Sequence, residues 1–214
     1  MRPARLAGVV LVGGRSARMG RDKGRIQVAG VELWRRQLGV LMRAGARPAL
    51  LSLRPGQRSF GWRGGEIRDA AANAGPLGGV AAALAAAPAP LVAVLAVDLP
   101  HMDAAWFRRL GRRCRPGSGA VVRGPLGYEP LAAIYPREAA ALCMARLRAG
   151  RLSLQSLLSA LVRQGRMAVL PMRMGDGARL ANWNTREDAG GRDDGGAGWR
   201  ARPQVAPAKR QSRL

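Results

Sequence analysis

Residues 6–23 read LAGVVLVGGRSARMGRDK, and this pattern indicates the class of the fold. Their first part, residues 6–12, is a continuous apolar run, which is typical of a strand buried on both faces of a parallel sheet. Gly13 and Gly14 follow directly and allow the backbone to turn tightly and to approach a ligand closely. Because glycine-rich turns after strands are common, these glycines by themselves favour a purely structural turn.

Further apolar runs alternate with amphipathic or alanine-rich segments along the chain. The apolar runs predict strands at residues 6–12, 49–53, 66–68, 91–97, 120–123, 131–135 and 167–170. The other segments predict helices at residues 31–44, 79–87, 103–113, 137–149 and 153–163. Such alternation favours an α/β fold with a mostly parallel sheet, in which ligands bind beyond the carboxyl ends of the strands.

Length and composition indicate the domain organisation. The chain has 214 residues, of which 48% are hydrophobic, and this is enough for a buried core and excludes wholesale disorder. We predict a single folded domain over residues 1–189. Residues 190–214 contain almost no large apolar side chain, and we predict a flexible basic tail there.

The sequence predicts a cytoplasmic location. Cys114 and Cys143 are isolated and lack the spacing of a metal site or a disulfide framework, which fits a reducing compartment. The first apolar run is followed by Gly13-Gly14-Arg15, without the cleavage site of a signal peptide. No apolar stretch approaches the ~20 residues that a membrane span needs, so we expect no membrane partner.

The net charge is large but carries little information about partners. The formal charge is +23, from 36 lysines and arginines against 13 acidic residues. A charge of this size ordinarily puts nucleic acid or an anionic membrane first among the partners. However, only Lys23 and Lys209 are lysines, and the abundant arginine, alanine, glycine and proline all have GC-rich codons. A bias in base composition therefore explains much of the charge, and we expect no nucleic-acid partner.

Lys23 is the informative exception, because it is the only lysine of the predicted domain. Arginine is a planar fork, whereas an ammonium group is a compact charge that fits between phosphate oxygens. The amides after the first strand, together with Arg15, Arg18 and Lys23, predict a phosphate-binding loop. The loop matches neither the GxGxxG nor the Walker pattern, which excludes the standard dinucleotide and P-loop sites.

Acidic residues follow two of the predicted strands. Asp98 follows the apolar run 91–97, where a carboxylate that faces a phosphate loop is well placed to hold Mg²⁺. The alternative role for Asp98, the N-cap of the next helix, suits Asp103 better. Taken alone, Asp69 is as compatible with a solvated position in a loop as with a role in a ligand site. His101, the sole histidine, has no partner in the sequence, and we interpret it as a loop or packing residue rather than a general base.

Two further sets of residues have structural interpretations. Trp34 and Trp106 occupy helical positions that predict packing in the core. Residues 182–185, Asn-Trp-Asn-Thr, leave two interpretations open: a turn that caps a short helix, or a segment whose asparagines reach the site.

Taken together, these residues resemble the nucleotidyltransferases that attach a nucleotide to molybdopterin, and most of all the guanylyltransferase branch. The resemblance covers residues 6–189 and is specific because its motifs occur in order and at compatible spacing. The matching residues are Leu11–Lys23, Asp69 with Gly75-Pro76-Leu77-Gly78-Gly79, Asp98-Leu99-Pro100, Glu129–Tyr135, Ser153-Leu154-Gln155 and Asn182–Thr185. The resemblance implies a Rossmann-like three-layer sandwich of the nucleotide-diphospho-sugar transferase type.

The resemblance also implies an activity and the residues that perform it. GMP would pass from GTP to the terminal phosphate of molybdopterin in an Mg²⁺-dependent reaction that forms the guanine dinucleotide and pyrophosphate. Proteins that supply or receive the molybdenum cofactor, including apo-molybdoenzymes, would be its protein partners. The implied GTP-binding residues are Leu11, Val12 and Gly13 through their main chain, Lys23 at the phosphates, Asp69 in the nucleotide pocket and Asp98, which would bind Mg²⁺; Lys23 and Asp98 would be catalytic.

Departures from the family pattern leave alternatives open. The nucleotide-contacting asparagine of the family is missing at residues 52–54, where Leu53 or Arg54 occupies the region. Val12 also replaces the usual alanine, which would add bulk near the base although a main-chain contact would survive. The double glycine after it favours the guanylyl over the cytidylyl branch. The nearest alternative is therefore a cytidylyltransferase or another nucleotidyltransferase of the same fold. A remote one is a non-catalytic arginine-rich RNA-binding protein, for which the chain lacks interleaved aromatic residues.

Overall fold

The apolar runs form one central sheet in the computed structural model, which describes residues 6–13, 22–69, 71 and 73–183. The sheet has eight strands in the order β10-β7-β9-β6-β1-β4-β5, with β8 paired to β7. These strands are β1 (Leu6–Leu11), β4 (Ala49–Leu53), β5 (Glu66–Arg68), β6 (Leu91–Ala96), β7 (Gly119–Gly124), β8 (Gly127–Tyr128), β9 (Ala132–Pro136) and β10 (Met167–Pro171). A separate hairpin is formed by β2 (Gln27–Val28) and β3 (Val31–Glu32).

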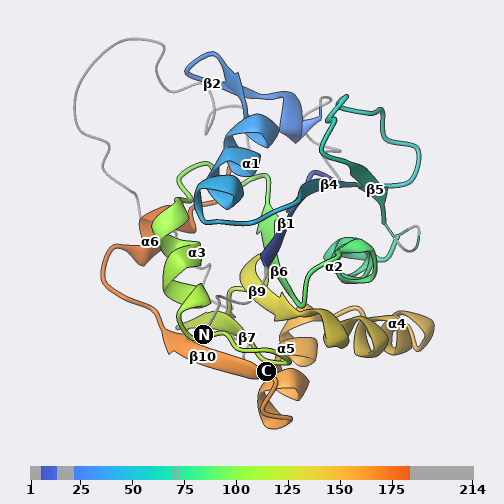
Figure 1. Cartoon of the computed structure of the whole chain (residues 1–214), viewed down its shortest axis with the longest axis vertical. Helices are drawn as coiled ribbons and strands as arrows, with labels where there is room; N and C mark the ends of the chain where they lie inside the picture. The colour runs from blue at the N-terminus through green and yellow to red at the C-terminus, as the bar shows by residue number, and fades with distance from the viewer. Residues whose placement is uncertain (1–5, 14–21, 70, 72, 184–214) are drawn as a thin grey trace, which may run out of the picture.

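Helices cover both faces of the sheet (Figure 1). They are α1 (Leu33–Arg43), α2 (Gly75–Ala86), α3 (Ala104–Gly111), α4 (Ala140–Arg148), α5 (Leu154–Arg163) and α6 (Asp176–Arg179), with 3-10 turns at Lys23–Arg25 and Arg137–Ala139. Side chains of α1 and α3 share one hydrophobic cluster with the sheet, and side chains of α2, α4 and α5 share the other. The fold is therefore the three-layer α/β sandwich that the resemblance implied.

β1 lies near the middle of the sheet and is buried on both faces, as its apolar run predicted. It pairs in parallel with β4 on one side and with β6 on the other. Val10 packs into the cluster beneath α1 and α3, whereas Ala7 and Val9 pack into the cluster beneath α2. β9 runs antiparallel to its neighbours β6 and β7, so the sheet is mostly parallel rather than wholly so. Because β1, β4 and β6 run the same way, their carboxyl ends meet at one edge of the sheet.

Several details differ from the sequence prediction. Val31 and Glu32, predicted as the start of the first helix, form β3 of a short hairpin with β2 that was not predicted, and α1 begins at Leu33. The predicted start of the second helix at residue 79 was wrong, because α2 begins at Gly75. Pro76 lies in its first turn, where no N–H is needed for the helical hydrogen bonds. The short elements β8 and α6 were not predicted, since they span too few residues to produce a periodic pattern.

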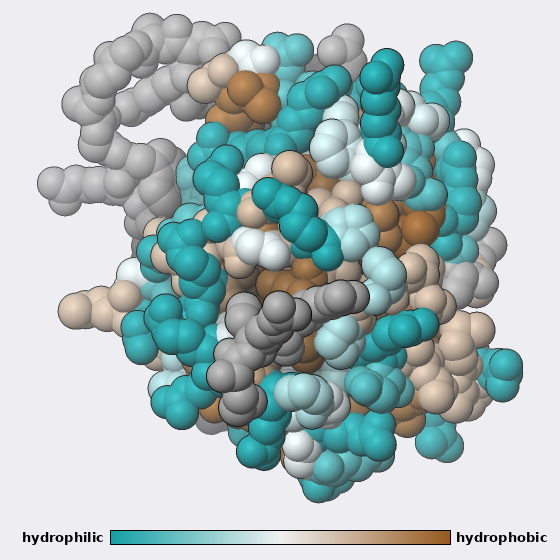
Figure 2. Space-filling model, viewed as in Figure 1, coloured by the Kyte–Doolittle hydropathy of each residue, from teal (hydrophilic) through white to brown (hydrophobic). Residues whose placement is uncertain are grey.

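Some predictions fall outside the described residues. They concern Gly14, Arg15 and Arg18 of the phosphate loop, Asn184 and Thr185, and the tail at 190–214. Within the described ranges, none of the helices has the length and apolarity needed to cross a lipid bilayer. On the face shown in Figure 2, hydrophilic side chains project from much of the surface, and apolar residues show between them and at some of the edges.

Candidate functional site

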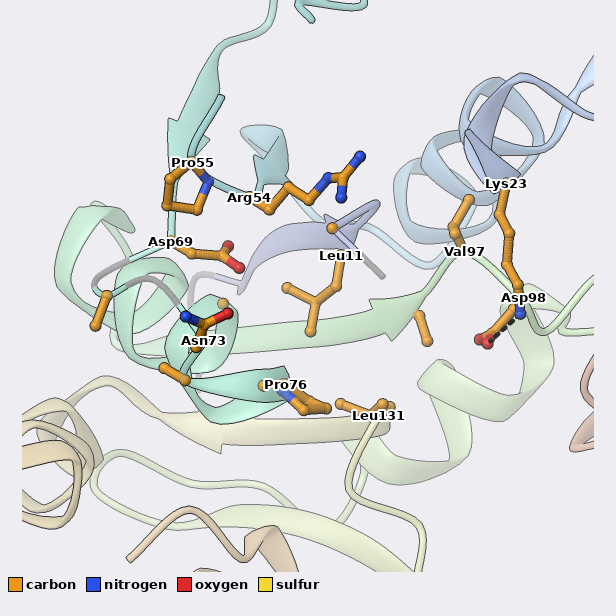
Figure 3. A pocket seen from close by; sticks show the side chains of 16 residues that line it. Leu11, Lys23, Arg54, Pro55, Asp69, Asn73, Pro76, Val97, Asp98 and Leu131 are labelled. Atoms are coloured by element: carbon orange, nitrogen blue, oxygen red, sulfur yellow. Dashed lines mark ion pairs between the residues drawn. The ribbon is translucent and has the colours of Figure 1, made fainter. Parts of the chain in front are cut away.

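A pocket of about 630 Å³ opens at the edge of the sheet where the carboxyl ends of β1, β4 and β6 meet (Figure 3). Its walls come from the residues that follow these strands and from the first turn of α2. The lining residues are Leu11, Gly13, Lys23, Arg54, Pro55, Asp69, Ala71, Asn73, Ala74, Gly75, Pro76, Gly79, Ala96, Val97, Asp98 and Leu131. In Figure 3, Asp69 lies on one side of the pocket and the Lys23–Asp98 pair on the other, with Leu11 between them.

Lys23 and Asp98 form the first polar end of the pocket, which we call the phosphate end. Lys23 Nζ lies 3.6 Å from Asp98 Oδ2 and donates a hydrogen bond of 2.9 Å to the main-chain carbonyl of Trp183. Lys23 begins a 3-10 turn whose N-cap is Asp22, where Oδ1 accepts from the amide of Gly24 at 3.1 Å. The ammonium group is therefore held beside the carboxylate by a local cap and by a residue far away in the sequence.

The loop that carries Asp98 is fixed from two directions. The amide of Trp183 donates to the carbonyl of Asp98 at 3.0 Å. From α1, Gln37 Nε2 donates to the carbonyl of Leu99 at 2.5 Å and Arg36 Nε donates to that of Pro100 at 3.0 Å. Because Gln37 is fully buried, it fixes the loop against the core.

Asp103 and His101 take the roles that the sequence predicted. Asp103 is the N-cap of α3 and accepts from the amide of Trp106 at 2.9 Å, which leaves Asp98 free of that structural role. His101 lies in the loop, and its ring contacts the Trp183 ring edge to face at 6.0 Å. Partial burial, with a contribution from Arg36, lowers the pKa of His101, so the neutral ring prevails at pH 7.

Asp69 forms the opposite end of the pocket, which we call the base end. Its Oδ1 accepts from Ser52 Oγ at 2.7 Å. Burial raises the pKa of Asp69, and the hydrogen bond from Ser52 lowers it in part, leaving it above the ordinary value. A Cβ at Gly79 would lie 3.2 Å from Asp69 Oδ1 and 3.1 Å from Leu11 Cδ2. The absence of a side chain at Gly79 therefore allows α2 to pack close against this carboxylate.

Gln57 connects the two segments that flank the predicted phosphate loop, and this role was not predicted from the sequence. Its Nε2 donates to the carbonyl of Val12 at 3.2 Å and to Asp22 Oδ2 at 2.5 Å, while its Oε1 accepts from the amide of Arg54 at 3.0 Å. The side chain is buried. An isolated glutamine in an irregular segment has no distinguishing pattern, so only the tertiary structure identifies this contact.

The structure places most of the predicted site residues around this one pocket. Leu11, Gly13, Lys23, Asp69 and Asp98 all line it, and their roles toward a ligand stay predictions.

The structure corrects the expectation for Val12 and distinguishes the two residues named for the region of the missing asparagine. The side chain of Val12 is buried in the core, so it adds no bulk inside the pocket. Its amide donates to the carbonyl of Ser52, and its carbonyl accepts from Gln57. At the site of the missing asparagine, Arg54 lines the pocket whereas Leu53 is buried.

Residues 182 and 183 also settle part of the choice that the sequence left open. The group that reaches the phosphate end is the main chain of Trp183, through its carbonyl and its amide. A main-chain contact of this kind leaves no signature in the residue type. Asn184 lies outside the described residues.

The arrangement suits a ligand with an anionic part and a planar part. The first turn of α2 lines the pocket, and a helix N-terminus favours negative charge, as does the ammonium of Lys23. The middle of the pocket is apolar at Leu11, Val97 and Leu131. At the base end, a carboxylate offers acceptors to the N–H groups of a ligand.

Comparison with known proteins points to one family. Residues 8–167 match the family described as the MobA-like NTP transferase domain. A probable molybdenum cofactor guanylyltransferase from Opitutus terrae is 50% identical over 186 residues, which cover 86% of this chain and 92% of that protein.

Solved structures share the fold at low identity. Molybdopterin-guanine dinucleotide biosynthesis protein A from Archaeoglobus fulgidus superimposes with a TM-score of 0.68 at 22% identity, covering 86% of this chain and 95% of that one. The 2-C-methyl-D-erythritol 4-phosphate cytidylyltransferase from Thermus thermophilus gives a TM-score of 0.63 at 19% identity, with coverage of 86% and 95%. At these identities the likeness concerns the fold alone.

Proposed function

The chain belongs to the MobA-like NTP transferase family, and we propose that it transfers GMP from GTP to the terminal phosphate of molybdopterin. The observation that carries this proposal is the pocket with two different polar ends. Lys23 and Asp98 lie 3.6 Å apart at one end, and the Ser52–Asp69 pair lies at the other. A pocket of about 630 Å³ lies within the usual range of small-molecule sites.

At the phosphate end, Lys23 binds phosphate oxygens. Its ammonium is a compact charge on a flexible stem, held in place by the Trp183 carbonyl and by Asp98. The first turn of α2 adds the partial positive charge of a helix N-terminus. These groups neutralise the charge of two phosphate-bearing substrates that must approach each other.

The donors at this end fit a magnesium ion. Magnesium in nucleotide enzymes usually keeps several waters and binds one or two carboxylates together with substrate phosphates. Asp98 supplies one partly exposed carboxylate, and the described residues contain no group of three side chains that would form an all-protein metal cage. When bound beside Asp98, Mg²⁺ supplies charge neutralisation and alignment of the phosphates.

At the base end, Asp69 favours guanine over cytosine. A carboxylate has two acceptor oxygens, and the Watson–Crick edge of guanine presents two neighbouring N–H donors. Cytosine presents one amino group on that edge next to acceptors, which would face the carboxylate oxygens. The Ser52 hydrogen bond holds the Asp69 carboxylate in one orientation. This selection distinguishes the proposed activity from that of the cytidylyltransferases that share the fold.

The reaction joins two phosphates and needs positioning more than proton transfer. An oxygen of the terminal phosphate of molybdopterin attacks the α-phosphorus of GTP. The new P–O bond forms as the bond from the α-phosphorus to the bridging oxygen breaks, and pyrophosphate leaves. Because the attacking phosphate is already ionised, no general base is needed.

Nucleotide titration tests this proposal. The protein is titrated with GTP, CTP and ATP in the presence of Mg²⁺, and binding is read by calorimetry. We expect a preference for GTP, followed by release of pyrophosphate and formation of the guanine dinucleotide when molybdopterin is added. A preference for CTP would favour the cytidylyl alternative, and the absence of any nucleotide response would contradict a nucleotidyltransferase.

The same proposal includes a location and partners. We propose a cytoplasmic location, which the isolated spacing of Cys114 and Cys143 in the sequence supports. Molybdopterin and its dinucleotide are the chemical links to other proteins. The proteins that supply the pterin or receive the finished cofactor, including apo-molybdoenzymes, are therefore its proposed partners.

A further inference from the structure

The segment from Met172 to Trp183, which we call the strap, connects the end of β10 with the phosphate end of the pocket. The amide of Met172 continues the sheet by donating to the carbonyl of Arg123 at 3.1 Å. The short helix α6 follows, and Figure 1 shows it beside α3. The strap lies beyond residue 167, where the match to the family ends.

A buried ion pair fastens the strap to α3. Asp176 is 2% exposed, and its Oδ2 lies 2.9 Å from Nη1 of Arg109, which is 8% exposed. The same oxygen accepts from the amide of Arg173 at 2.8 Å. The guanidinium group of Arg109 also lies over the Trp106 ring at 4.8 Å. Buried charges need their partners, so this pair fixes one position of the strap on α3.

Arg179 adds a second attachment. Its Nε lies 2.7 Å from Asp103 Oδ2, and its Nη1 lies 3.3 Å from Asp176 Oδ1. Asp103 is the N-cap of α3, so Arg179 ties the strap to the same helix end that follows the Asp98 loop. This contact lowers the pKa of Asp103 below its ordinary value. Partial burial raises the pKa, but the hydrogen bonds from Arg179 and from the Trp106 amide lower it by more.

The strap ends where it contacts both charged residues of the phosphate end. The carbonyl of Trp183 accepts from Lys23 Nζ, and the amide of Trp183 donates to the carbonyl of Asp98. Both contacts use the main chain, so their positions depend on where the strap lies and not on the Trp183 side chain. A flexible lysine stem keeps one rotamer only if its acceptor is fixed.

We propose that the strap is a positioning element of the active site. Resting on the function proposed above, the proposal assigns to Asp176 and Arg179 the task of holding the Trp183 carbonyl where it fixes Lys23 beside Asp98. A purely structural ion pair would affect only the stability of the fold. A positioning pair also determines how firmly the Lys23 ammonium is held, and this property can be measured on its own.

The scarcity of lysine provides the measurement. Lys23 and Lys209 are the only lysines of the chain, so an amine-acylating reagent at limiting concentration modifies two side chains that mass spectrometry separates by peptide. The ratio of Lys23 to Lys209 labelling reports the freedom of Lys23, and Lys209 corrects for reagent activity. Neither nucleotide nor pterin is needed, so a failure of the proposed guanylyl transfer would leave this test intact.

The variants are Arg179→Ala and Asp176→Asn, with Arg173→Ala as the matched control. Arg173→Ala makes the same charge change as Arg179→Ala on the same strap, but the Arg173 side chain is exposed. We expect the labelling ratio to rise about three- to tenfold in Arg179→Ala and Asp176→Asn, because a held ammonium loses its acceptor. The control ratio should match that of the unmodified sequence, and kcat/KM for GTP should fall in the order in which the ratio rises.

An unchanged labelling ratio in a folded Arg179→Ala protein would overturn the proposal. Circular dichroism establishes folding for each variant. If Asp176→Asn leaves Arg109 unpaired and does not fold, Arg179→Ala still decides, since Asp176 keeps its Arg109 partner there. A rise of equal size in Arg173→Ala would also contradict the proposal, because it would show a general effect of charge.

Discussion

The base end and the phosphate end of the pocket are built in opposite ways. At the base end, Ser52 lies in β4 and Asp69 directly follows the neighbouring parallel strand β5, 17 residues further along the chain. The pairing of these two strands, which an irregular segment connects, is enough to bring them together. At the phosphate end, Lys23 and the Trp183 carbonyl are 160 residues apart. The base end therefore depends on local structure, whereas the phosphate end depends on contacts that span the whole domain.

The two ends also differ in electrostatic environment. Asp69 is a half-buried carboxyl with a neutral hydrogen-bond partner, and burial raises its pKa. Asp98 is a partly exposed carboxyl beside an ammonium group. The base end is thus suited to selecting a ligand by its hydrogen bonds, and the phosphate end to stabilising charge during the reaction. Substitutions at the base end should therefore act mainly on KM for GTP, and substitutions at the phosphate end mainly on kcat.

The largest effect is expected from Asp98→Asn. Removal of this carboxylate should lower kcat/KM for pyrophosphate release by about a thousandfold, as for other charged groups that act on the transition state. The fold should persist, since Asp103 and not Asp98 caps α3. Glu138→Gln is the control, because it makes the same acid-to-amide change at an exposed position of a 3-10 turn. Undiminished turnover in Asp98→Asn would exclude Asp98 as the metal ligand.

Lys23→Arg should have the next largest effect although the charge is conserved. A planar guanidinium group does not fit the compact geometry between the Trp183 carbonyl and Asp98, and we expect kcat to fall about ten- to a hundredfold. Arg25→Lys, on the same 3-10 turn but with an exposed side chain, is the matched control. If Lys23→Arg were silent, the inference from the lone lysine of the domain would be wrong.

At the base end, pH and Asp69→Asn should act on KM for GTP. A carboxylate accepts from guanine N–H groups, and protonation removes that capacity. The affinity of the protein for GTP should therefore decline as the pH falls. Because burial raises the pKa of Asp69, this decline should begin at a higher pH than it would with an ordinary aspartate. Asp69→Asn should raise KM by about tenfold at neutral pH and abolish this pH dependence. A pH profile of KM that is identical in both proteins would show that Asp69 does not contact the base.

The smallest effect is expected from deletion of residues 190–214, which should leave both ends of the pocket unchanged. The segment has almost no large apolar side chain to contribute to a core. Turnover should change by less than about twofold, and the melting temperature should stay the same. Loss of folding on truncation would contradict the prediction that the domain ends near residue 189.

The sequence predicted the features that depend on local pattern. β1 was recognisable because a strand buried on both faces must be apolar throughout, and Asp103 because an N-cap has a preferred residue type. Lys23 and Asp98 were found as exceptions to the composition, Lys23 as the lone lysine of the domain and Asp98 as an acid after an apolar strand. All of these signals lie within a few residues of the group that they describe.

The remaining features depend on tertiary contacts that leave no local signal. The start of α2 was placed too late, since glycine and proline usually mark a loop and here form the first turn. Gln57 and the Trp183 main chain escaped notice because an isolated glutamine and a backbone carbonyl have no pattern of their own. The attachment of Asp176 to Arg109 likewise joins segments that are distant in sequence.

The hydrogen bond from Lys23 to Trp183 has a consequence for the order of events during synthesis. A ribosome releases the N-terminal half first, and the pocket walls up to Leu131 can assemble as they emerge. Contacts between distant segments form late because a long loop of chain must be closed. Trp183 leaves the ribosome after every other residue that borders the pocket in the described structure. In a nascent chain the base end can therefore form while the phosphate end is still incomplete. Catalytic competence would then be the last property that this domain acquires.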